Sequence, residues 1–64
     1  MELTEREKEV LYFLVQGLNN TQIAGKLMVS IHTVKAHICS IFSKLNVTGR
    51  VQAAVKAIKL GLIK

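Results

Sequence analysis

Hydrophobic residues recur at helical spacing in four separate stretches of the chain. The first stretch follows Thr4, and Glu7 stands three residues after that threonine. A threonine and a glutamate at this spacing form a capping box, which satisfies free backbone N–H groups where a helix begins. Gly17, shortly after the last apolar residue of the stretch, is the residue type that commonly ends a helix. We therefore expect a first helix over about 5–16.

Capping residues also precede the other three stretches. Asn19 and Gln22 repeat the capping-box spacing, and Ser30 and Thr48 stand before the third and fourth stretches. Gly25 lies inside the second predicted helix, where glycine costs about 1 kcal/mol relative to alanine unless close packing requires it. No strand-like alternation of apolar and polar residues competes with these helices. The pattern predicts an all-α fold, a compact four-helix domain with helices over about 5–16, 20–27, 31–45 and 49–60.

The third predicted helix has one apolar face and one face of small residues. The apolar stripe, which we expect in the core, comprises Val34, Ile38, Ile41 and Leu45, flanked by Ile31 and Phe42. The opposite face comprises His32, Ala36, Cys39 and Ser43, with Lys35 and Ser40 at its edges. A purely structural outer face would be expected to carry long charged side chains. The small residues instead favour close approach to another surface.

The second and third predicted helices have the spacing of a helix-turn-helix, because a three-residue connection separates them. In that motif the N-terminal half of the second helix reaches base edges in the major groove, which is about 12 Å wide and admits one helix. Here that half carries His32, Thr33, Lys35, Ala36 and Cys39. The alternative is an ordinary solvent-exposed face of a helical bundle, and the spacing alone leaves that alternative open.

The fourth predicted helix has apolar residues on both sides. One set is expected in the core: Val51, Ala54, Val55, Ile58 and the trailing Leu62. The outward side would then show Ala53, Ala57 and Leu60, with Lys56 and Arg50 beside them. Small residues at this spacing let two copies of a helix pack closely, so the predicted dimer interface is Ala53, Ala57, Leu60 and Lys56. A merely tolerated apolar surface is the alternative.

Length and charge narrow the class of protein. The chain has 64 residues, of which 50% are hydrophobic, and this predicts one ordered domain over 1–64. Nine Lys and Arg against four acids give a formal net charge of +5, and every acid lies before Val10. Such asymmetry indicates a polyanionic partner, either nucleic acid or an anionic membrane surface. The membrane surface is the weaker option, because the basic residues are spread over several predicted helices.

The side chains offer little chemistry beyond binding. The sequence has no aspartate and no Ser-His-carboxylate or cysteine cluster, so we predict no enzyme activity, no metal and no cofactor. His32 and His37 point in different directions on a regular helix and cannot hold one metal ion. Cys39 has no second cysteine for an internal disulfide, which suits the reducing cytoplasm. Oxidation of Cys39 at the binding surface is a less common alternative to a simple packing role.

Several segments resemble one protein family. LTEREKEVL is similar to the LTxRExEVL opening of the LuxR-type, or NarL-type, DNA-binding domains of bacterial transcription regulators. NNTQIAGKL resembles the second-helix pattern of that family, SIHTVKAH its SxxTVKxH motif, and IFSKLNV its IxxKLxV motif. Arg50, Ala54 and the closing GLI match its final helix, so the resemblance covers essentially the whole chain. It implies a four-helix domain that binds promoter DNA and often dimerises through its last helix.

The resemblance also implies roles for single residues. Expected base contacts are Lys35, Ala36 and Cys39, to which the helix-turn-helix geometry adds His32. Expected phosphate contacts are Asn19, Asn20, Thr21, Ser30, Thr33, His37, Lys44 and Arg50. Packing at the border of the third helix is an equally open role for His37. In this family a glutamate of the first helix often pairs with arginine, so a bridge from Glu7 or Glu9 to Arg50 is one option and a solvated face the other.

The sequence thus predicts specific binding of double-stranded promoter DNA by a cytoplasmic bacterial regulator of the response-regulator type. A homodimer on DNA and RNA polymerase are the candidate protein partners. Two alternatives remain: a helical protein-interaction module, or the promoter-reading helix-turn-helix of sigma factors, which fits the long fourth helix less well. Members of the resembled family usually carry an N-terminal receiver or ligand-binding domain as well.

Overall fold

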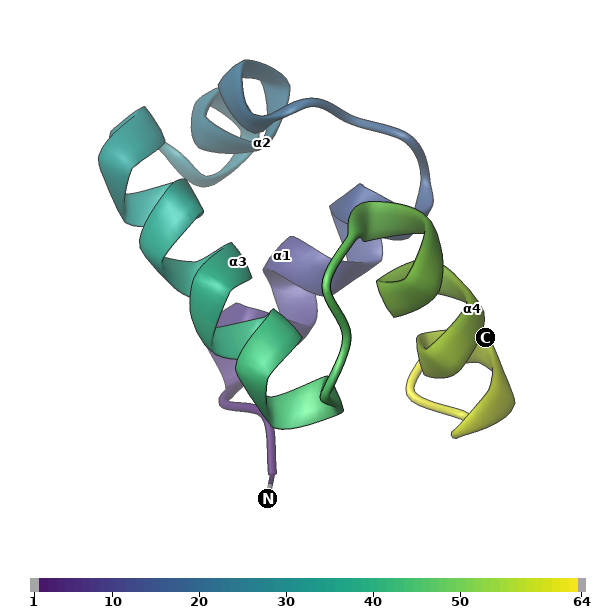
Figure 1. Cartoon of the computed structure of the whole chain (residues 1–64). Coiled ribbons are helices and arrows are strands. Elements are labelled where there is room, and N and C mark those ends of the chain that lie inside the picture. Colours follow the sequence, from purple (N-terminus) through teal and green to yellow (C-terminus); the bar gives the residue numbers. More distant parts are fainter. Residues whose placement is uncertain (1, 64) are drawn as a thin grey trace.

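Each predicted helix is present in the computed structural model of the chain, which describes residues 2–63. No strand occurs within this range, so the all-α prediction is confirmed. In Figure 1, α1 crosses behind the molecule, α2 and α3 form the helix-turn-helix, and α4 lies on the other side of α1 from α3. The observed bounds are Glu5–Val15 for α1, Asn20–Leu27 for α2, Ile31–Leu45 for α3 and Arg50–Lys59 for α4.

The predicted helix starts are confirmed for the first three helices. Thr4 and Glu7 form both hydrogen bonds of a capping box, as do Asn19 and Gln22. The Ser30 side chain accepts a hydrogen bond from the backbone N–H of Thr33. Since these residues lie directly before or within the first turn, they fix where each helix begins.

The predicted cap of the fourth helix is wrong by one residue. Gly49, in extended conformation, precedes α4 and makes no side-chain cap hydrogen bond. Thr48 lies just outside and donates from its backbone N–H and its hydroxyl to Oε1 of Gln52. The helix ends at Lys59, one residue before the predicted end, and Gly61 just beyond it adopts a positive φ of 72°.

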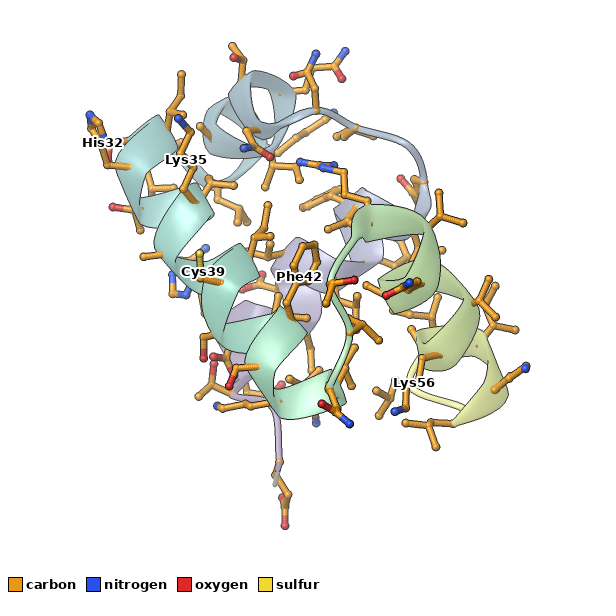
Figure 2. All side chains as sticks on the ribbon, viewed as in Figure 1. His32, Lys35, Cys39, Phe42 and Lys56 are labelled. Carbon is orange, nitrogen blue, oxygen red and sulfur yellow. The ribbon has the colours of Figure 1, made fainter. Side chains whose placement is uncertain are left out.

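One hydrophobic core joins all four helices, and it contains the apolar stripe predicted for the third helix. The stripe residues Val34, Ile38, Ile41 and Leu45 are all buried. Phe42 is half-buried and points from α3 toward α4 (Figure 2). Ile31, at the start of α3, stays 39% exposed. The core therefore holds one side of α3 and leaves the other side free.

The predicted faces of α4 are wrong for most of their residues, although Leu60 is exposed as predicted. Ala53 and Ala57 are fully buried, whereas Val51 is 78% exposed and Ile58 60% exposed. Small side chains allow α4 to approach α1 closely, and the β-branched residues then point away from the core. Because both faces are apolar, hydrophobicity alone does not distinguish them.

Candidate nucleic-acid interface

The outer face of α3 carries the four predicted base-contact residues. His32, Lys35, Ala36 and Cys39 are all exposed, and we call these four residues the reading face. In Figure 2, His32 projects outward from the first turn of α3, and Lys35 and Cys39 follow along the same helix. Ala36 adds no bulk between them. A helix with one cation and otherwise short or neutral side chains on its outer face can enter a groove closely.

The N-terminal ends of α2 and α3 carry most of the other predicted contacts. Asn19, Thr21, Ser30 and Thr33 are exposed, and Asn20 is half-buried. Backbone N–H groups in the first turn of a helix have no partner within that helix, and the helix dipole adds partial positive charge there. An anion such as a phosphate can accept from those N–H groups and from neighbouring hydroxyls.

Lys44 faces α1 rather than the solvent side of α3. Its Nζ lies 2.7 Å from Oε1 of Glu7, and Ser40 Oγ donates to Oε2 of the same carboxylate at 2.5 Å. We call Glu7, Ser40 and Lys44 the Glu7 cluster. The ammonium of Lys44 is thus engaged within the domain, although a phosphate contact was expected from it.

Among residues 2–63, Glu7 is the one charged residue in the core, since its exposed fraction is 5%. Burial on its own raises the pKa of the Glu7 carboxyl, but hydrogen bonds from Lys44, Ser40 and the backbone N–H of Thr4 outweigh it and lower the pKa to about 2. The carboxylate is therefore ionised and paired at neutral pH. The interpretation of this glutamate as part of a solvated face is wrong.

Arg50 is also held inside the domain. Its guanidinium donates to the backbone carbonyl of Leu18 at 3.0 Å and to Oδ1 of Asn20. This ties the start of α4 to the loop before α2. The optional bridge from Glu7 or Glu9 to Arg50 is absent. Glu7 pairs with Lys44, and Glu9 pairs with Arg6 at 3.6 Å on the exposed side of α1.

His37 lies at the border between the core and the exposed side of α3, where it is half-buried. This half-buried position is compatible with both predicted roles of His37, packing and phosphate contact. Lys26, exposed in the last turn of α2, is a cation that was not among the predicted contacts. With Lys35 it supplies exposed positive charge on the helix-turn-helix.

Glu7 and Ser40 are two further functional candidates that sequence reasoning missed. The burial of Glu7 could have been predicted, because Glu7 stands at helical spacing from the buried residues Val10, Leu11 and Leu14. Its partner Lys44 is 37 residues away along the chain, and local pattern cannot supply such a pairing. Within residues 2–63, no group of three His, Cys, Asp or Glu side chains is placed to hold a metal ion. No helix in that range has the length and apolarity to cross a membrane.

The sequence is similar to known bacterial regulators. Residues 1–57 match the family model described as bacterial regulatory proteins, luxR family. The transcriptional regulatory protein LnrK of Bacillus subtilis is 50% identical over 62 residues, and the nitrate/nitrite response regulator protein NarP of Escherichia coli is 55% identical over 53 residues. The match covers 97% and 83% of this chain, but only 28% and 25% of those two proteins.

Solved structures have the same fold. The response regulator ChrA of a heme-sensing two-component system matches with a TM-score of 0.94 at 46% identity, over 98% of this chain and 31% of that chain. The transcription factor GerE matches with a TM-score of 0.89 at 37% identity, over 97% of this chain and 92% of GerE. The four-helix arrangement around α2 and α3 is therefore shared with transcription regulators.

Proposed function

This chain belongs to the luxR family of bacterial regulatory proteins, a family of DNA-binding transcription regulators, and on that premise we propose that it binds double-stranded promoter DNA in a sequence-specific manner, with α3 in the major groove. The observation that carries the proposal is the reading face. It is exposed along α3, while the opposite side of the same helix is buried. The core thereby fixes which residues point outward.

The proposed contacts divide into two kinds. Lys35 donates to guanine or to a phosphate, Ala36 contacts a thymine methyl group, and Cys39 and His32 lie against neighbouring base edges. The helix N-termini with Asn19, Thr21, Ser30 and Thr33 bind phosphates and set the register. Exposed Lys26 and Lys35 contribute to non-specific attraction, which falls as salt rises because bound phosphates release counterions.

The experiment is a selection of binding sites from random duplexes, followed by affinity measurements at several salt concentrations. We expect an enriched site and an affinity that falls steeply with salt. Lys35→Ala should lower the affinity for the selected duplex by roughly 5- to 150-fold, equivalent to about 1–3 kcal/mol. A flat salt response, or no enriched sequence, would contradict the proposal.

We also propose that two copies associate on DNA through the exposed apolar side of α4. Val51, Val55 and Ile58 are exposed on this helix, and we call them the aliphatic face. The interface expected from the sequence cannot form as stated, because Ala53 and Ala57 are in the core. Lys56 is half-buried at the edge of the face, beside Leu45 and Leu60 in a surface hollow.

The dimer proposal is tested by comparing two substitutions on opposite sides of α4. Val55→Ser should weaken cooperative binding of a duplex with two half-sites and leave single half-site binding unchanged. Leu60→Ser, at a residue of similar exposure on the side first expected to dimerise, should leave cooperativity in place. Loss of cooperativity with Leu60→Ser alone would contradict association through the aliphatic face.

A further inference from the structure

The Glu7 cluster is the only polar side-chain connection from α3 to another helix within residues 2–63. It joins α1 to the C-terminal half of α3 at two positions one turn apart, Ser40 and Lys44. Everything else that holds α3 against α1 is apolar packing among residues such as Val10, Leu11 and Ile41. Packing of this kind is largely non-directional, whereas hydrogen bonds to a carboxylate have defined distances and angles.

Both oxygens of the Glu7 carboxylate accept hydrogen bonds. Oε1 accepts from Lys44 Nζ at 2.7 Å and from the backbone N–H of Thr4 at 2.8 Å, and Oε2 accepts from Ser40 Oγ at 2.5 Å. The bond to Thr4 belongs to the capping box of α1. One side chain thus fixes its own position on α1 and holds two points on α3.

From this geometry we infer that Glu7 is a positioning residue for base reading, which sets the rotation of α3 about its own axis. The effect of this rotation on DNA binding rests on the proposed function. A helix with side chains has a radius of about 5–6 Å, so a rotation of about 20° displaces the tips on the reading face by about 2 Å. Contacts with base edges lose their geometry with smaller displacements than that.

The same pairing keeps one cation away from DNA. The Lys44 side chain is 24% exposed and its charge is matched by a carboxylate that is 6% exposed. If Glu7 loses its charge, the lysine becomes free to turn outward and attract phosphates of any sequence. Loss of Glu7 is therefore expected to lower binding of the cognate site without a matching loss on random DNA.

The experiment compares Glu7→Gln with Ile63→Ala in the same chain. Glutamine keeps the size of the side chain and removes its charge. Ile63 packs against the core at the C-terminal end, beside Tyr12 and Phe13, and its truncation lowers stability without touching α3. Ser40→Ala, which removes one of the two bonds to α3, serves as a milder second variant if Glu7→Gln does not fold.

Two readouts are needed, of which the first requires no DNA. Residual dipolar couplings of ¹⁵N-labelled protein report the orientation of α3 relative to α1, and we expect a changed orientation in Glu7→Gln and a wild-type one in Ile63→Ala. The second readout is the ratio of affinities for the selected and a random duplex. We expect this ratio to fall about tenfold in Glu7→Gln, comparable with one mismatched base pair, and to stay within twofold in Ile63→Ala.

A folded Glu7→Gln or Ser40→Ala variant with wild-type couplings overturns the inference. So does a fall in the affinity ratio that is no larger than in Ile63→Ala. Failure of the proposed function would look different, because wild-type protein would then bind selected and random duplexes alike. In that case the couplings alone decide whether Glu7 sets the orientation of α3.

Discussion

The outward faces of α3 and α4 differ in chemistry, although both helices pack on the same core. The reading face of α3 carries a lysine, a histidine, a cysteine and an alanine, and the aliphatic face of α4 carries two valines and an isoleucine. The first face suits a hydrated, negatively charged groove, and the second suits another apolar surface. The two surfaces thus differ in the kind of partner that their chemistry suits.

The inward faces differ as well. Bulky residues bury one side of α3, and the Glu7 cluster adds a directional link to α1. The buried side of α4 instead consists of Ala53 and Ala57, and Arg50 links its start to the loop before α2. Directional hydrogen bonds thus help to fix the rotation of α3 about its own axis, whereas close packing of small side chains holds α4 against the core.

The largest expected effect is a loss of stability at low pH. It should affect α3, which the Glu7 cluster links to α1, before it affects α4. The pKa of Glu7 lies at about 2 in the folded protein, below its ordinary value of 4.5. A lowered pKa stabilises the fold at every pH above 4.5, and this contribution is lost as the pH falls from about 4.5 to 2. Wild type should lose about 2–3 kcal/mol more than Glu7→Gln over that interval, the lower value allowing for solvent screening at the partly exposed Lys44.

Urea unfolding at pH 7, 4.5, 3 and 2 measures this difference. The C-terminal half of α3 should also lose hydrogen-exchange protection before α4 does. Equal pH dependence in wild type and Glu7→Gln would show that the Glu7 cluster does not link α3 to α1 energetically.

A smaller effect distinguishes the two faces of α4. Ala57→Leu places three additional carbons where α4 packs on the core and should lower stability by about 1–3 kcal/mol. Val55→Leu, on the aliphatic face at 46% exposure, should change stability by less than about 0.5 kcal/mol. Denaturant midpoints of the two variants test the assignment, and it is wrong if the Val55 variant is the more destabilised.

The smallest expected effect concerns α2, which supports the reading half of α3. A Cβ added at Gly25 would meet no atom within 4 Å, so close packing does not require glycine there. Gly25→Ala should therefore raise the free energy of unfolding by about 1 kcal/mol. Gly17→Ala should have the opposite sign, because Gly17 has a φ of 92°. Thermal unfolding of both variants checks this, and a gain in stability for Gly17→Ala would contradict it.

The helices were predictable from sequence because their starts are encoded locally. The capping pairs at Thr4 and Asn19 use partners three residues away, and the stripe on α3 follows one helical period. The reading face was predictable for the same reason, since it is the side opposite that stripe. Residues on a helix surface are ordered by the period alone.

The remaining features depend on distant parts of the chain. Glu7 and Lys44 are 37 residues apart, and Arg50 and Leu18 are 32 apart, so neither pairing follows from local spacing. Hydrophobicity could not distinguish the two faces of α4, because both are apolar. Which face is buried depends on steric fit against α1, where small side chains pack more closely. Charge pairing and steric fit thus determine the long-range pairings and the buried face of α4, which helical periodicity does not specify.

The central claim is that α3, and not α4, faces DNA. Titration of ¹⁵N-labelled protein with a selected duplex, followed by amide chemical shifts, tests it most directly. We predict saturable shifts that are largest between His32 and Cys39 and at the start of α2. Shifts centred on Val51, Val55 and Ile58, with none on the reading face, would contradict the account.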